Sequence, residues 1–172
     1  MPDSDALPIL IEDTYGWFQG EAVESRNKKD GYENVRKVGI FHLSESVPED
    51  PAILQWSKTV EKELSLCQQD YIKHYAIDTL ANINSGYQVL SYGIGDYFSE
   101  HTDEVPEAPR RISGVYYIND NYEGGELFFS QFNISFKPLA KDYILFPSIW
   151  AYSHTAMPVI SGTKNAIVHF LA

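Results

Sequence analysis

Three side chains in the second half of the sequence have the types and spacing needed to hold one metal ion. His101 and Asp103 are two residues apart, so on an extended strand both side chains point to the same face. His154 lies in a later segment of β character that can approach them. Two imidazoles and one carboxylate leave three coordination positions open, which suits Fe(II) and its reactants. Because such triples also arise by chance, the surrounding residues must show whether this one binds a metal.

A lysine that follows the third candidate ligand adds a second chemical signal. Lys164 opens the apolar segment Asn165–Phe170. An ammonium group facing the inside of a barrel there would be costly unless it met an anion, and the far carboxylate of 2-oxoglutarate would be such an anion. Tyr92, together with Ser113 and Tyr117 on one face of a later segment, offers hydroxyl groups to the same carboxylate.

Helical periodicity dominates the segment that precedes these residues. Asp50 and Pro51 form a favourable helix start, a capping carboxylate followed by a proline at the first helical position. Apolar residues then recur at intervals of three and four and predict a buried stripe: Ile53, Trp56, Val60, Leu64 and Cys67. Cys67 is the single cysteine and is expected to be a small buried hydrophobe. A second helical stripe is predicted to follow: Ile72, Ala76, Leu80 and Ile83.

Beyond Ser85 and Gly86 the pattern changes to short aromatic and β-branched segments separated by turn residues, which is typical of successive strands. The predicted strands are Gln88–Tyr92, Ile112–Ile118, Glu126–Ser130, Ile134–Phe136, Tyr143–Phe146, Ser153–Met157 and Asn165–Leu171. The predicted fold class is α+β but mainly β, a double-stranded β-helix (jelly-roll) barrel with supporting helices packed on one sheet.

The length of 172 residues and the absence of a linker predict a single domain over the whole chain. Within it, residues 1–85 are expected to supply N-terminal strands and supporting helices, and residues 86–172 the jelly-roll core. The stretch Glu21–Arg36 is polar and predicts a loop or hairpin tip. Both a solvated loop and a mobile flap over the site are compatible with its composition.

The formal net charge of −11 argues against nucleic acid and anionic membrane surfaces as partners, since both are bound through Lys and Arg. It favours a neutral or basic substrate. No basic leader precedes an apolar run, and no apolar segment approaches the length of a membrane span. We therefore expect a soluble, cytoplasmic protein.

Several segments of the second half resemble the prolyl 4-hydroxylase-like branch of the Fe(II)- and 2-oxoglutarate-dependent oxygenases. The similarity runs in the family's order from about Val89 to Phe170. The matching segments are the first metal motif at Tyr92–Asp103, the strand at Arg110–Asn119, the glycine turn at Tyr122–Leu127, and a second half comprising Phe146–Ser148, His154 and Pro158–Lys164. The helical first half is compatible with the family.

The resemblance implies a dioxygenase that couples the decarboxylation of 2-oxoglutarate to succinate with the hydroxylation of a C–H bond. Its co-substrates are 2-oxoglutarate and O2, with ascorbate as an optional reductant. It implies Fe(II) bound by the catalytic residues His101, Asp103 and His154. Lys164 would hold the C5 carboxylate of 2-oxoglutarate, with Tyr92 and Tyr117 as its hydroxyl partners.

The resemblance also predicts the substrate, which is a proline residue in a peptide or protein. Arg110 lies where family members place an arginine facing the substrate peptide, and Phe170 lies where the hydroxylases usually carry a tryptophan. Trp150, close to His154, is a further candidate at the entrance. Hydroxylation of a free amino acid, another small molecule or another side chain is the alternative within enzymes, and an inactive jelly roll that binds a ligand is the alternative outside them.

The other histidines are not expected to bind the metal. His169 is an odd number of residues from Lys164, so on a regular strand its side chain points away from the pocket. His42 and His74 lie in the first half without a carboxylate at a suitable spacing, and packing or surface positions are expected for them.

Overall fold

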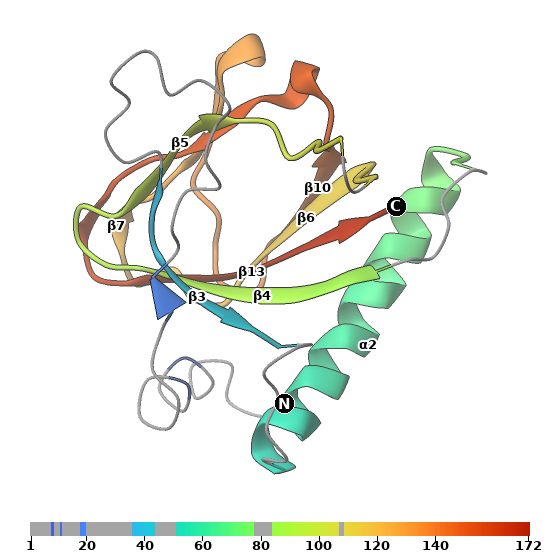
Figure 1. Cartoon of the computed structure of the whole chain (residues 1–172), viewed down its shortest axis with the longest axis horizontal. Helices are drawn as coiled ribbons and strands as arrows, with labels where there is room; N and C mark the ends of the chain where they lie inside the picture. The colour runs from blue at the N-terminus through green and yellow to red at the C-terminus, as the bar shows by residue number, and fades with distance from the viewer. Residues whose placement is uncertain are drawn as a thin grey trace.

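Two antiparallel sheets face one another and form the body of the protein in a computed structural model (Figure 1). The structure describes Pro8, Ile11 and residues 18–19, 36–43, 51–77, 84–106 and 109–172. The six-stranded sheet has the order β1 (Phe18–Gln19), β3 (Gly39–His42), β4 (Asn84–Tyr92), β13 (Lys164–Leu171), β6 (Ile112–Tyr117) and β10 (Tyr143–Pro147). The five-stranded sheet has the order β2 (Arg36–Lys37), β5 (Tyr97–His101), β11 (His154–Ala156), β8 (Leu127–Phe129) and β9 (Ile134–Phe136).

A short ribbon of β7 (Glu123–Gly124) and β12 (Val159–Ser161) and two single turns, η1 (Ser130–Phe132) and η2 (Trp150–Tyr152), join these strands. The predicted fold class is confirmed, and every predicted strand is present with ends shifted by a few residues. The prediction missed β5, β7 and β12, because their segments are short or interrupted by glycine and acidic residues, and it expected N-terminal strands without placing β1, β2 or β3.

Strand β13 lies between β4 and β6 and has two different faces. Residues 164, 166, 168 and 170 line a cavity between the two sheets. The intervening Ile167 belongs to the core beneath the helix, and His169 is fully buried on that side. The alternation of a strand thus separates the cavity from the structural core, as predicted for His169.

The helix α2 (Pro51–His74) covers the six-stranded sheet (Figure 1). It begins at Pro51, as predicted, and buries Ile53, Trp56 and Leu64 against a core that includes Phe41 and Val89 of the sheet. Apolar burial of this kind contributes about 25 cal/mol per Å² removed from water.

Two expectations for the helical region were wrong. Cys67 is exposed, because the buried face continues from Leu64 to Gln68, whose amide meets polar partners in the sheet. Ile72 does not begin a second helix but lies in the last turns of α2, and Ala76 has a left-handed backbone with φ of 48° that ends helical geometry. Leu80 and Ile83 lie outside the described residues.

A buried polar cluster joins α2 to the sheet. The side-chain amide of Gln68 donates to the Tyr143 hydroxyl at 3.1 Å, and that hydroxyl contacts Nε2 of His169. Burial lowers the pKa of His169 to about 4, so the imidazole is neutral at physiological pH. Gly114 on the neighbouring strand leaves room for this cluster.

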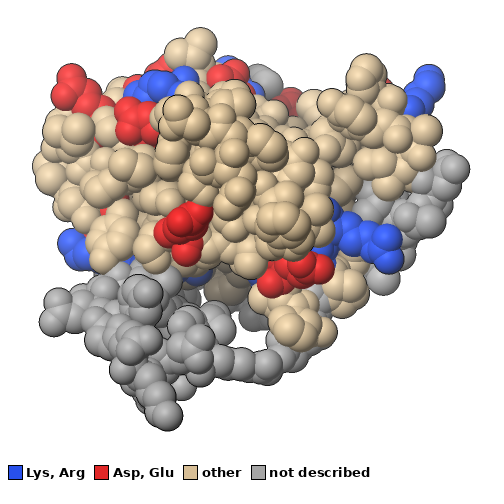
Figure 2. Space-filling model, turned by 90° about the horizontal axis from the view of Figure 1, so that it is seen from above, with Lys and Arg blue, Asp and Glu red and all other residues tan. Residues whose placement is uncertain are grey.

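The surface view shows Lys and Arg in small groups beside Asp and Glu, and the described part of this face carries no continuous basic stripe (Figure 2). None of the helices among the described residues combines the length and hydropathy that a membrane span requires.

Replacing Gly114 with alanine is expected to lower the free energy of unfolding by about 1–3 kcal/mol. A β-carbon there would overlap Nε2 of His169 and lie 2.8 Å from the Tyr143 hydroxyl oxygen. Urea denaturation measures the change. Gly93→Ala is the control, because its β-carbon would meet only an ordinary contact at 3.5 Å. Equal stability of the two variants would contradict the tight packing around His169.

Candidate active site

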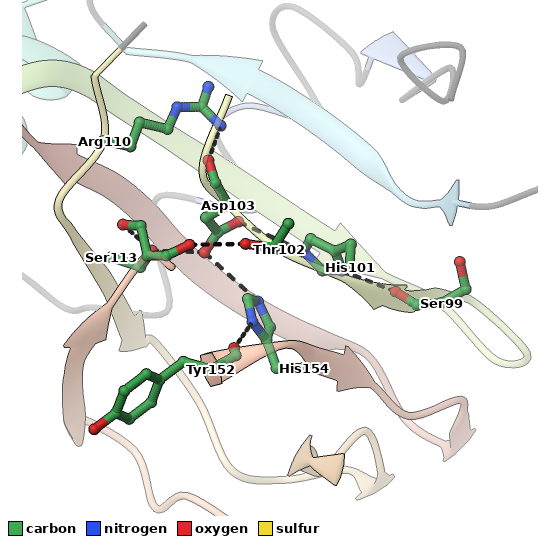
Figure 3. A network of polar contacts seen from close by, with 9 residues as sticks. Ser99, His101, Thr102, Asp103, Arg110, Ser113, Tyr152 and His154 are labelled. Carbon is green, nitrogen blue, oxygen red and sulfur yellow. Dashed lines mark hydrogen bonds and ion pairs between the residues drawn. The ribbon is translucent and has the colours of Figure 1, made fainter. Parts of the chain in front are cut away.

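The ladder between β5 and β11 places two imidazoles side by side. His154 lies directly opposite His101, and their ring centroids are 4.3 Å apart. Nδ1 of His101 donates to the Ser99 carbonyl at 2.8 Å, and Nδ1 of His154 donates to the Tyr152 carbonyl at 3.0 Å (Figure 3). A carbonyl oxygen only accepts, so both Nδ1 atoms carry the proton and both Nε2 lone pairs are available to a metal.

Asp103 completes the group just beyond the end of β5 (Figure 3). Its Oδ1 lies 3.5 Å from Nε2 of His101, and its Oδ2 lies 3.6 Å from Nε2 of His154. One ligand atom from each of the three residues lies within 4.8 Å of the others, and this is the group among the described residues that could hold a metal ion. The predicted triad is therefore assembled from two separate segments of one sheet.

The carboxylate of Asp103 is held in place from behind. The Ser113 hydroxyl donates to Oδ2 at 2.6 Å and lies 2.8 Å from the Ser148 hydroxyl. Burial alone would raise the pKa of Asp103, but the two histidines and the Ser113 hydrogen bond outweigh it and lower the pKa to about 2. Burial also lowers the pKa of His154. An ionised carboxylate and a neutral imidazole are the forms that bind a metal.

These three groups face a cavity of about 600 Å³ between the sheets. Its walls are partly apolar and include Leu90, Val115, Leu127, Ala156 and Val168. Its polar side chains include the triad, Lys164, Tyr92, Tyr117, Arg36 and Arg110. A largely apolar cleft with a few convergent polar groups is the usual form of a small-molecule site.

Lys164, Tyr92 and Tyr117 lie close together in the wall of this cavity. Lys164 is only 3% exposed and donates to the Gly125 carbonyl at 2.8 Å, while its ammonium lies 4.8 Å from the ring centroid of Tyr92 and 5.6 Å from that of Tyr117. Burial and, secondarily, the nearby charge of Lys137 lower the pKa of Lys164 to about 7. The buried Tyr117 hydroxyl has no hydrogen-bond partner among the described residues. A carboxylate could accept hydrogen bonds from both the Lys164 ammonium and the Tyr117 hydroxyl, so these residues fit the C5 carboxylate of 2-oxoglutarate.

The structure brings some of the other predicted residues to the cavity. Arg110 and Phe170 both line it, and the Arg110 guanidinium stacks 3.8 Å from the Phe170 ring centroid. Ser113 lies behind Asp103 instead of beside Lys164. Trp150 is 69% exposed in η2 and is not part of the cavity wall, because that turn directs its ring to solvent.

Phe98 and Arg36 are cavity residues whose place in the site was not predicted from the sequence. Phe98 stacks on His101 with ring centroids 3.5 Å apart and an interplanar angle of 13°. Arg36, expected in a polar loop, instead forms β2 beside β5, and its guanidinium lies 4.7 Å from the Phe98 ring centroid. The rest of that polar stretch lies outside the described residues. The available signal was the spacing of two residues between Arg36, Val38 and Ile40, which places Arg36 on the same face of an extended segment as two buried apolar residues.

The comparison with protein families identifies the class of enzyme. The model of the 2OG-Fe(II) oxygenase superfamily matches residues 87–172, which is half of the chain. The chain therefore belongs to this superfamily, whose members use Fe(II) and 2-oxoglutarate. A search of curated proteins found no match.

Several solved structures share the fold. A prolyl hydroxylase from Trichoplax adhaerens in complex with a hypoxia inducible factor peptide fragment has a TM-score of 0.70 and 19% identity, over 99% of this chain and 78% of that chain. A prolyl-4-hydroxylase from Pseudomonas putida has a TM-score of 0.64 and 20% identity, over 99% and 87%. The viral collagen prolyl hydroxylase of Paramecium Bursaria Chlorella virus-1, in complex with 2OG, has a TM-score of 0.61 and 19% identity, over 80% of each chain.

Replacing Ser113 with alanine is expected to weaken metal binding by about tenfold or more, because groups that hydrogen-bond a ligand orient it for the metal. The variant loses the 2.6 Å hydrogen bond to Oδ2 of Asp103. The measurement is the dissociation constant for Mn(II), followed by electron paramagnetic resonance. Ser135→Ala, at an exposed position of β9, serves as the control. Wild-type affinity in Ser113→Ala would show that Asp103 needs no such support.

Proposed function

We propose that this oxygenase is a peptidyl-prolyl hydroxylase, which hydroxylates proline in a peptide or protein with 2-oxoglutarate and O2 as co-substrates. The observation that carries the proposal is that the His101–Asp103–His154 group and the Lys164 anion site open into the same cavity, with Arg110 and Phe170 on its wall. The structural neighbours described as prolyl hydroxylases support this choice of substrate.

Each part of the cavity has a separate role in this proposal. His101, Asp103 and His154 hold Fe(II) through two Nε2 atoms and one carboxylate oxygen. Lys164 binds the C5 carboxylate of 2-oxoglutarate, and the Tyr92 and Tyr117 hydroxyls complete its hydrogen bonds. Arg110 and Phe170 contact the peptide.

When bound, the iron would supply the chemistry by which O2 oxidises 2-oxoglutarate to succinate and CO2 and places its second oxygen atom in the C–H bond to form an alcohol. The protein supplies orientation. The Ser99 and Tyr152 carbonyls fix the planes of the two imidazoles through their Nδ1–H groups. Burial of Tyr92 raises its pKa to about 12, so its hydroxyl stays protonated and donates to the co-substrate. The apolar walls keep water from the reacting carbon.

Turnover of 2-oxoglutarate to succinate tests the proposal directly. We expect the anaerobically purified protein, given Fe(II), ascorbate and air, to form succinate faster when a proline-rich peptide is added. Mass spectrometry should find one oxygen atom added to the proline residue. His101→Ala should abolish both signals, because one of the three metal ligands is lost.

The same assay separates the alternatives. Iron-dependent succinate formation that no peptide stimulates would keep the oxygenase activity and reject the peptidyl substrate in favour of a free amino acid or another small molecule. A protein that binds 2-oxoglutarate and Fe(II) without forming succinate would be the inactive jelly roll. Failure to bind either would overturn the assignment of the site residues.

The affinity for 2-oxoglutarate is expected to fall as the pH rises above 7. The anion binds the protonated form of Lys164, whose pKa in the free protein is lowered to about 7 by burial. Below this pH the lysine is already charged, so the dissociation constant does not change with pH. Above it the protonated fraction falls, and the dissociation constant rises by up to about tenfold per pH unit.

Calorimetry of the Mn(II)-loaded protein between about pH 6.5 and 8.5 measures this dependence and the proton taken up on binding. Lys164→Met should weaken binding and remove the pH dependence. Lys62→Met removes an exposed charge of α2 and should leave both unchanged. A pH-independent affinity in the wild type would argue against Lys164 as the partner of the carboxylate.

A further inference from the structure

Two arginines enter the cavity from different sheets close to the metal ligands. Arg36 comes from β2 of the five-stranded sheet and is half-buried, and Arg110 comes from the segment before β6 and is also half-buried. Nη1 of Arg110 donates to the Asp103 backbone carbonyl at 3.3 Å (Figure 3). Both guanidinium groups also lie against aromatic rings, Arg36 on Phe98 and Arg110 on Phe170. They are held by packing at fixed places in the wall.

Both guanidinium groups line the same cavity, so their two positive charges share one partly desolvated space. Burial lowers the pKa of Arg110, and the charge of Arg36 adds to this effect, while Asp103 opposes it. Burial also lowers the pKa of Arg36, while Tyr92 and Asp103 oppose it. Like charges that share a partly desolvated pocket repel one another unless an anion lies between them.

No carboxylate of the described residues forms a side-chain ion pair with either arginine. The acidic groups on the wall are Glu100, Asp103 and Glu104. Asp103 is engaged by Ser113 and the two histidines, and Glu100 accepts from Ser130. Glu104 is exposed. Moreover, Nε of Arg36 is buried and has no hydrogen-bond partner among the described residues. An unpaired donor in a cavity is the feature expected of a site that awaits its ligand.

We propose that Arg36 and Arg110 together hold a carboxylate of the primary substrate beside the metal ligands, so that the enzyme selects an anionic substrate. The inference rests on the proposed hydroxylase function and narrows its substrate class. Planar guanidinium groups suit a carboxylate because each can donate two parallel hydrogen bonds to it. Lys164 is a separate cation, on the same face of β13 as Phe170, and is reserved for the co-substrate in this arrangement.

Two sources of the carboxylate are compatible with the pocket, namely the α-carboxylate of a C-terminal proline and the side chain of an acidic residue next to proline. Two pairs of probes distinguish them. N-acetyl-L-proline and N-acetyl-L-prolinamide differ only in the α-carboxylate. The blocked peptides acetyl-Gly-Pro-Glu-Gly-amide and acetyl-Gly-Pro-Gln-Gly-amide differ only in the side chain.

Calorimetry of the protein loaded with Mn(II) and 2-oxoglutarate, without oxygen, measures binding of each probe. We expect the wild type to bind the acid of at least one pair about tenfold more tightly than its amide. Arg36→Met should reduce that preference to less than about threefold, and Arg36→Lys should restore part of it, because the charge remains while the paired hydrogen bonds are lost. Lys58→Met removes one exposed charge of α2 and should not change it.

If the wild type prefers the acid in the first pair, the bound group is the α-carboxylate. If it prefers the acid in the second pair, the bound group is the acidic side chain. Both results support the proposal. Equal affinity for acid and amide in both pairs, or no binding of either acid by the wild type, overturns it. So does an Arg36→Met variant that weakens 2-oxoglutarate binding but keeps the preference, since the anion would then be the co-substrate.

Succinate assays with the same peptides separate the two proposals. If acid and amide peptides are hydroxylated at equal rates, the hydroxylase function is supported and the carboxylate site is rejected. If an acid binds in an Arg36-dependent way but is not hydroxylated, the carboxylate site is supported and the hydroxylase function is rejected.

Discussion

The backbone pairing that sets His154 directly opposite His101 is the constraint on which the site depends. In a strand, successive side chains alternate between faces, so a slip of one residue in this ladder would turn one imidazole out of the cavity. The neighbouring strand β8 holds β11 from its other side, with His154 opposite Phe129. Because three strands share this register, main-chain hydrogen bonds place the two imidazoles, while Asp103 follows the end of β5 and is held by the Ser113 hydroxyl.

Strand β13 shows how the fold treats two buried polar groups differently. His169 faces the helix, where burial keeps it neutral and Tyr143 contacts its Nε2 atom. Lys164 faces the cavity, where one carbonyl is the hydrogen-bond acceptor for an ammonium that has three donors. Nε2 of His169 meets the Tyr143 hydroxyl, although the buried Nδ1 has no hydrogen-bond partner among the described residues, whereas the unused donors of Lys164 face the cavity. Neither burial nor an unpartnered polar atom therefore marks a functional residue by itself, whereas unused donors that line a cavity are accessible to a ligand.

Much of the site could be predicted because its signals are local. The separation of His101 from Asp103 and the position of Lys164 at the start of an apolar segment both follow from side-chain alternation in strands. Ser113 was expected near Lys164 because it shares a face with Tyr117, but four residues of a strand span roughly 13 Å, and it instead reaches Asp103. Cys67 was misplaced because steps of three and four both keep a residue near a helical stripe. The position of Arg36 in β2 could not be predicted, because the composition of a polar stretch does not show at which residue a strand begins.

The charge of the whole chain and the charge of the cavity act over different distances. A net charge of −11 favours neutral or basic partners at long range, but salt at physiological strength screens exposed charges beyond about 8 Å. Inside the cavity, Lys164, Arg36 and Arg110 lie in a less polar environment, where each charge interacts more strongly. An anion is thus repelled weakly on approach and attracted strongly once it has entered. For this reason net charge describes the encounter, and the side chains of the cavity determine which substrate is kept.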